Sequence, residues 1–140
     1  MEKYKVLLVD DEAEVIEVIE QRIQWDDLGF TVVGNATNGV KALELVEKLQ
    51  PDVVITDIKM PYMDGLELSR RLNRDFQNIH IIIFTGFDEF EYAKEAVHLE
   101  VEEYMLKPIN ATELSDCLKR LKDTCLLYTS PSPRDISGSR

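Results

Sequence analysis

The sequence predicts an α/β fold in which one parallel sheet carries helices on both faces. Five short apolar segments alternate along the 140 residues with segments whose apolar residues recur at helical spacing. The clearest of them, Val53-Val54-Ile55, shows no polar alternation, as expected for a parallel strand that is buried on both sides. Strands that alternate with helices form parallel sheets with helical crossovers. We therefore expect a doubly wound sheet of five strands.

The five expected strands are short and mostly β-branched or aromatic. They occupy residues 6–9, 30–36, 53–57, 79–84 and 101–106. The last is less apolar because Glu102 and Glu103 interrupt it, which favours a place at an edge of the sheet.

Apolar residues at helical spacing predict five helices between and after these strands. Their apolar stripes cover residues 15–23, 40–49, 66–72, 90–99 and 114–121. The first helix is expected to fade near Trp25 and Gly29, and Thr112 is expected to cap the last one. From about Asp123 the composition becomes that of a linker. We expect residues 1–123 to form one domain and residues 124–140 to be a disordered linker or a non-native tail.

Composition and charge exclude several classes of function. The chain has 44% hydrophobic and 31% charged residues, and its 27 acidic residues against 16 basic ones give a formal charge of -11. Such a surface repels phosphates, so DNA contact would need another domain. No apolar run approaches the roughly 18 residues of a membrane span, and we expect a cytoplasmic protein with no membrane contact. The two cysteines lack zinc-site spacing, and Cys117 is expected to be a buried helix residue.

Residues whose side chains could take part in chemistry or bind a metal follow the ends of the expected strands. Asp10 and Asp11 follow the first strand, Asp57 ends the third, Thr85 follows the fourth and Lys107 follows the fifth. Parallel strands end at the same edge of a sheet, and the doubly wound order brings the first and third together at its switch point. We therefore expect these side chains to converge. Each has an ordinary explanation alone, such as a helix cap, a turn residue or a surface cation, so the prediction rests on their joint occurrence.

Three converging carboxylates repel one another unless a cation neutralises them. Oxygen ligands without nearby His or Cys favour a hard ion, and a shell with room for water and a phosphoryl oxygen suits Mg²⁺. With the metal in place, Asp57 can attack a phosphoryl group. Lys107 can then pair with the new phosphoryl oxygens, and the Thr85 hydroxyl can donate a hydrogen bond to one of them.

These positions resemble the receiver domain of two-component response regulators, over about residues 4–122. The matching segments are residues 8–12, 56–61, 63–65, 85–86 and 104–108. The resemblance implies a flavodoxin-like (βα)5 sandwich with strand order 2-1-3-4-5. It also implies a phosphoacceptor switch rather than an enzyme, with self-phosphorylation and slow autodephosphorylation at most.

By this resemblance Asp57 would be the phosphoacceptor, served by a partner histidine kinase. Asp11 would bind Mg²⁺ directly, Asp10 through water, and the backbone carbonyl of Lys59 would be a third protein ligand.

Thr85 and Tyr104 would form the switch pair that couples phosphorylation to the face of the fourth helix, fifth strand and fifth helix. Lys107-Pro108 resembles the family's cis peptide bond. Within the family, residues 25–30 and 87–93 look like those of regulators with an AraC-type helix-turn-helix output domain. Homodimerisation on phosphorylation is possible, and transcription control would need a DNA-binding domain that is not in this chain.

Three other classes of protein share part of this pattern. A haloacid dehalogenase-type phosphatase would carry an acidic residue two positions after the nucleophile, where Lys59 stands. A flavodoxin-like electron carrier would place the FMN phosphate in the loop of Asp10, Asp11 and Glu12, which would repel it. A stand-alone receiver that acts by docking to partners differs only in the sequence after residue 123.

Overall fold

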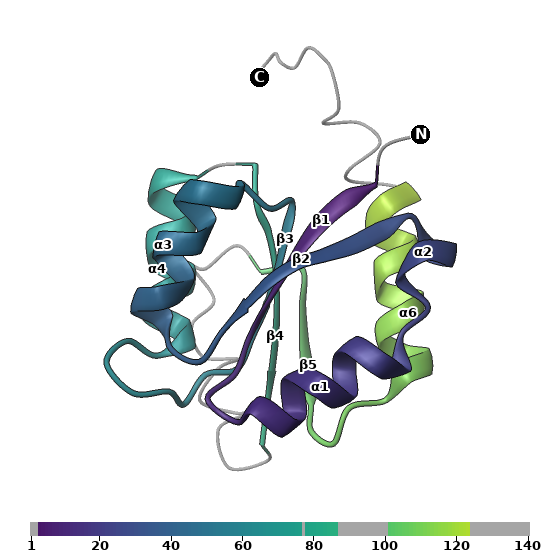
Figure 1. The fold of residues 1–140 in the computed structure, drawn as a ribbon, viewed down its shortest axis with the longest axis horizontal. Coiled ribbons are helices and arrows are strands. Elements are labelled where there is room, and N and C mark those ends of the chain that lie inside the picture. The colour runs from purple at the N-terminus through teal and green to yellow at the C-terminus, as the bar shows by residue number, and fades with distance from the viewer. Residues whose placement is uncertain (1–2, 77, 87–100, 124–140) are drawn as a thin grey trace.

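The fold is a single parallel sheet between two layers of helices. The computed structural model describes residues 3–76, 78–86 and 101–123. The strands are β1 (Tyr4–Val9), β2 (Phe30–Ala36), β3 (Val53–Thr56), β4 (His80–Thr85) and β5 (Glu103–Leu106). They pair in parallel in the order β2-β1-β3-β4-β5, which confirms the predicted fold and the edge position of β5 (Figure 1).

The described helices cover both faces of the sheet. They are α1 (Ala13–Arg22), α2 (Trp25–Leu28), α3 (Gly39–Leu49), α4 (Gly65–Asp75) and α6 (Ala111–Leu121). Helices α3 and α4 lie on one face, and α1, α2 and α6 lie on the other (Figure 1). The expected helix over residues 90–99 and the tail over residues 124–140 lie outside the described residues. None of the helices in the described ranges is long and apolar enough to cross a membrane.

The first helical segment differs from its expected form. Helix α1 ends at Arg22, and Trp25 begins a separate short helix that ends at Gly29. Gly29 adopts φ of 87°, and its N–H bonds back to the carbonyl of Asp26. Glycine enters this left-handed region without steric cost, so it ends α2 and turns the chain into β2.

Two hydrophobic clusters fill the space between the sheet and the helix layers. Alternate residues of β1 point to opposite sides: Val6 and Leu8 belong to the cluster under α1 and α6, and Leu7 and Val9 belong to the cluster under α3 and α4. All four residues of β3 are buried. The central strands are thus covered on both faces, as their unbroken apolar sequences predict.

Backbone hydrogen bonds continue past the strand ends and align the residues beyond them. The N–H of Asp10 donates to the Ala36 carbonyl at 3.1 Å, and the N–H of Asp57 donates to the Val9 carbonyl at 3.0 Å. These two bonds hold Asp10 and Asp57 side by side at one rim of the sheet.

The cap of helix α6 was predicted wrongly. Thr112 lies inside the helix, and the N-cap is Asn110, whose side-chain oxygen accepts from the N–H of Glu113 at 2.9 Å. Threonine is a common cap, but asparagine is at least as good, and its position after Lys107-Pro108 lets the helix begin two residues earlier.

Asn110→Ala is expected to destabilise the protein by about 1 kcal/mol, because the substitution removes an N-cap hydrogen bond. Thr112→Ala, at an exposed position within the helix, is expected to change the free energy of unfolding by less than about 0.5 kcal/mol. Urea denaturation followed by circular dichroism measures both. A larger loss in Thr112→Ala than in Asn110→Ala would contradict the assignment of the cap.

Candidate acidic phosphoacceptor site

Asp57 lies at the carboxyl end of the central strand β3, with its carboxylate almost buried. The residue is 6% exposed. Its Oδ1 accepts from the N–H of Ile58 at 2.7 Å, and its Oδ2 accepts from Lys107 Nζ at 3.1 Å. Both carboxylate oxygens are therefore oriented by donors from two separate segments of the chain.

Asp10 and Asp11 stand beside Asp57 but differ from each other in exposure. Asp10 is buried, and its Oδ1 accepts from the N–H of Glu12 at 2.9 Å, whereas Asp11 is exposed. One carboxylate oxygen from each of Asp10, Asp11 and Asp57 lies within 4.8 Å of the others. The predicted convergence of these three residues is confirmed.

Lys107 reaches across the sheet into this cluster from the end of β5. Its Nζ lies 2.9 Å from Asp10 Oδ2, off the direction of a hydrogen bond, and 3.1 Å from Asp57 Oδ2. Its backbone N–H donates to the Thr85 carbonyl at 2.8 Å, and the Lys107-Pro108 peptide bond is cis, as the resemblance implied. One ammonium group thus contacts two buried carboxylates.

The carboxylates remain short of positive charge despite this ammonium group. Burial raises the pKa of Asp57 above its ordinary value of 3.8, and the hydrogen bond from Lys107 only partly opposes this rise. Burial likewise raises the pKa of Asp10, against the hydrogen bond from Glu12 and the contact with Lys107. Partial burial would lower the pKa of Lys107, but the contacts with Asp10 and Asp57 outweigh it and the pKa rises. A further cation beside the carboxylates would favour their charged forms and lower their pKa values.

The donor set fits Mg²⁺. The three carboxylates supply only hard oxygen ligands, and Asp11 is open to solvent, which leaves room for water. The Oδ2 atom of Asp10 is buried, and within the described residues it accepts no well-directed hydrogen bond, although it is paired with Lys107 Nζ at 2.9 Å. A metal ion could share this oxygen. The place of the Lys59 backbone carbonyl in the shell stays a prediction.

Thr85 and Tyr104 belong to β4 and β5, the two strands on the far side of β3 from β1. Thr85 is fully buried at the end of β4, and within the described residues its hydroxyl has no hydrogen-bond partner. Tyr104 on β5 pairs with Ile83, two residues before Thr85, and packs against the cluster under α3 and α4. Because residues two apart share a face of the sheet, Thr85 and Tyr104 point to the same side.

Sequence reasoning missed the part played by Gly65. Its N–H donates to the Ile58 carbonyl at 2.7 Å, and a Cβ at this position would lie 1.9 Å from the backbone oxygen of Asp57. The absence of a side chain therefore lets the start of α4 lie directly against the backbone of the site. The available signal was Asp64-Gly65, where a capping residue precedes a glycine at a helix start.

Comparison with known proteins identifies the family. Residues 6–119 match the family model of the response regulator receiver domain. The uncharacterized transcriptional regulatory protein YesN of Bacillus subtilis (strain 168) is 42% identical over 118 residues, which cover 84% of this chain and 32% of that protein.

Two solved structures resemble the whole described fold. The REC domain of AraT, a response regulator from Geobacillus stearothermophilus, has a TM-score of 0.85 at 38% identity, covering 91% of this chain and 98% of that one. The two component transcriptional regulator AraC from Clostridium phytofermentans ISDg has a TM-score of 0.83 at 31% identity, covering 92% of this chain and 100% of that one.

The chain spans about a third to about a half of the length of the curated relatives it matches, at 32% and 53%. The residues matched by the family model include Asp10, Asp11, Asp57 and Lys107. The solved neighbours include a regulator named AraC, as the sequence resemblance implied. The chain belongs to the response regulator receiver domain family of two-component systems.

Proposed function

We propose that this chain is a phosphorylation-dependent switch that accepts a phosphoryl group on Asp57. The observation that carries the proposal is the placement of one nearly buried carboxylate between Lys107 and two further acids. This arrangement gives a nucleophile, a fixed positive charge and a set of metal ligands within one rim of the sheet.

The chemistry requires one bond to form and one to break. A carboxylate oxygen of Asp57 attacks the phosphorus, and the bond from phosphorus to the donor's leaving atom breaks, with the electron pair leaving on the donor. Lys107 Nζ, already 3.1 Å from Asp57 Oδ2, is placed to pair with the charge that arrives. The N–H of Ile58 holds the other carboxylate oxygen in a fixed orientation.

Asp10, Asp11 and Asp57 would hold Mg²⁺, with the Lys59 carbonyl as a further ligand. When bound, the ion supplies charge neutralisation for the phosphoryl oxygens. Asp10 and Asp11 would contribute ligand oxygens. The bound ion would neutralise part of their charge, so these acids would repel an anionic phosphoryl donor less.

Thr85 and Tyr104 would couple phosphorylation of Asp57 to a change at the protein surface. The Thr85 hydroxyl is buried without a described partner, so a phosphoryl oxygen on Asp57 offers it an acceptor. Movement of Thr85 would leave space on the side of the sheet toward which Tyr104 points, and the ring would turn into that space. The surface altered in this way includes β5, the edge strand.

A histidine kinase is the expected phosphoryl donor, and control of transcription through a DNA-binding domain is the expected output. The relatives YesN and AraC are named as transcriptional regulators, which supports this output. Phosphorylation could also drive homodimerisation, and a stand-alone receiver that docks to partners is the alternative function. A haloacid dehalogenase-type phosphatase is disfavoured, because the exposed Lys59 stands where its acid would be.

The proposal is tested by the intact mass of the protein after incubation with acetyl phosphate. We expect the gain of one phosphoryl group in the presence of Mg²⁺ and a much smaller gain in EDTA. A folded protein that gains no mass under either condition would overturn the proposal.

Mg²⁺ is expected to stabilise the folded protein. A ligand that binds only the folded state adds about 2.7 kcal/mol at a concentration 100 times its Kd. For a domain of this size that corresponds to a rise in Tm of roughly 10 °C. Differential scanning fluorimetry of EDTA-treated protein measures the shift.

Asp11→Asn should lose most of the Mg²⁺-dependent rise in Tm, because it removes the exposed carboxylate of the cluster. Asp116→Asn is the matched control, since Asp116 is an exposed acid on α6 that is distant from the cluster in the chain. Equal Mg²⁺ shifts in wild type and Asp11→Asn would contradict the assignment of Asp11 as a ligand.

A further inference from the structure

We propose that the groove between α1 and the outer edge of β2 binds a basic, extended peptide segment of a partner protein. This α1–β2 groove consists of two adjoining hollows of about 350 and 390 Å³ that share Glu20. The first is lined by Trp25, Val32 and Asp26, and the second by Ile16, Glu17 and Asn35.

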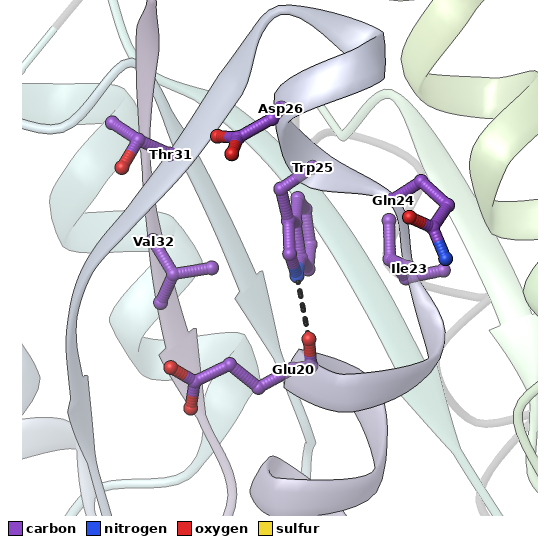
Figure 2. A pocket seen from close by; sticks show the side chains of 7 residues that line it. All are labelled: Glu20, Ile23, Gln24, Trp25, Asp26, Thr31 and Val32. Carbon is purple, nitrogen blue, oxygen red and sulfur yellow. Dashed lines mark hydrogen bonds between the residues drawn. The ribbon is translucent and has the colours of Figure 1, made fainter.

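The first hollow is lined by polar and apolar side chains, with an acid at each end. Figure 2 shows the Trp25 ring beside Val32, with the carboxylates of Glu20 and Asp26 at the two ends of the hollow. A hydrogen bond from Trp25 Nε1 to the Glu20 carbonyl, at 3.1 Å, holds the ring in this position. Trp25 is only 8% exposed, so the carboxylates dominate this site. An arginine side chain fits it, since its guanidinium can pair with the carboxylates while its stem lies over the exposed part of the ring.

The second hollow continues the acidic lining along α1. Glu14, Glu17 and Glu20 are exposed and stand three residues apart, so they lie along one side of the helix. Within the described residues no cation lies within ion-pair distance of any of the three. Like charges at this spacing destabilise a helix by a few tenths of a kcal/mol per pair, and a basic partner would relieve that repulsion.

The sheet edge beside the groove is also open. Strand β2 is the last in the order of the sheet, and in the described part of the chain it pairs only with β1. Its outer N–H and C=O groups can therefore receive an extended segment. The pairing with β1 shifts at Val33, which stands between the residues that line the two hollows. Val32 and Asn35 are about 10 Å apart along an extended strand. Residues four positions apart in an extended segment point to the same face, so two long basic side chains at that spacing would reach both hollows.

The charge of the whole chain decides between possible occupants. With a formal charge of -11, the protein repels nucleic acid and anionic membranes, and a second copy docked by the same groove would set acid against acid. Cationic side chains on an otherwise uncharged peptide are the complementary chemistry.

The test uses a fluorescein-labelled peptide of eight residues with two arginines four positions apart and threonine and valine elsewhere. The matched peptide carries glutamates in place of the arginines. Fluorescence anisotropy measures binding, and quenching of Trp25, the single tryptophan of the chain, reports contact at the groove on unlabelled peptide. We expect saturable binding and quenching by the arginine peptide, and neither by the glutamate peptide.

Variants separate the groove from general attraction to an acidic protein. Glu17→Gln with Glu20→Gln is expected to weaken binding at least 5-fold. Glu44→Gln with Glu47→Gln makes the same change of charge at the same spacing on exposed positions of α3, on the other face of the sheet, and should leave affinity within 2-fold. Equal weakening by both pairs, binding without a change in Trp25 fluorescence, or no binding at all would each overturn the proposal. Uptake of a phosphoryl group by the Glu17→Gln, Glu20→Gln protein is expected to match wild type.

Discussion

Asp57→Asn is expected to abolish the Mg²⁺-dependent gain of a phosphoryl group completely. An amide has no anionic oxygen to attack phosphorus, and the other acids of the cluster are held differently: Asp10 is directed toward Glu12 and Lys107, and Asp11 is exposed. Intact mass spectrometry after incubation with acetyl phosphate measures the loss directly.

The matched control for this substitution is Asp64→Asn in the loop after β3. The Asp64 side chain caps α4 by accepting from the N–H of Glu67 at 2.8 Å, and asparagine caps helices equally well. Asp64→Asn should therefore accept a phosphoryl group as wild type does. A phosphoryl group that still appears on the Asp57→Asn protein would place the acceptor elsewhere.

Asp57→Asn also has a predicted effect on the free energy of unfolding in the absence of metal. Because burial raises the pKa of Asp57 in the folded state, the folded protein binds more protons than the unfolded chain just above pH 3.8, the ordinary value. The stability of the wild type therefore falls as pH rises through this window, and asparagine does not titrate. Urea denaturation in EDTA should show wild type losing stability relative to Asp57→Asn as pH rises from about 4 to 7. A difference that does not change with pH would contradict this prediction.

Gly65→Ala is expected to be the most damaging single-methyl change near the site. The new Cβ would lie 1.9 Å from the Asp57 carbonyl oxygen and 3.0 Å from Ile58 Cα, and both neighbours are backbone that cannot rotate away. The start of α4 or the end of β3 must move. We expect a loss of about 3 kcal/mol or more in the free energy of unfolding. Displacement of Asp57 should also slow phosphoryl uptake by about tenfold or more.

Gly34→Ala is the matched control for Gly65→Ala. At Gly34 the nearest atom to a new Cβ is Leu49 Cδ1 at 3.1 Å, the far end of a flexible side chain. That variant should lose less than about 1 kcal/mol and keep the phosphoryl uptake of the wild type. Equal stability of the two variants in thermal unfolding would show that the backbone of the site yields more easily than the contact implies.

The fold was predictable because its central strands are unusual in composition. Val53, Val54 and Ile55 are apolar on both faces, as expected for a strand that is covered on both sides, and the strand order follows once the resemblance is recognised. The ends of elements were less predictable. Asn110 and Thr112 are both good caps, and the choice between them depends on how the chain leaves β5. Local sequence does not contain that geometry.

The site was predictable in membership but not in its electrostatics. Parallel strand ends dictate that Asp10, Asp57 and Lys107 meet, and they do meet. Adjacent aspartates in a sequence look equivalent, yet Asp10 is 1% exposed while Asp11 faces solvent. Successive side chains of an extended segment point to opposite sides. Which of the two aspartates is buried therefore depends on how the chain is oriented as it leaves β1.

The path of Lys107 divides the sheet into two functional halves. The acids follow β1 and β3, whereas Thr85, Tyr104 and Lys107 belong to β4, β5 and the residue after β5. Lys107 joins the halves, with its backbone bonded to Thr85 and its ammonium group on Asp10 and Asp57. Apart from Thr85 and Lys107, the residues of β4, β5 and α6 can therefore change in sequence while the arrangement of the acids stays the same. A single fold can in this way keep one input reaction and acquire many different outputs.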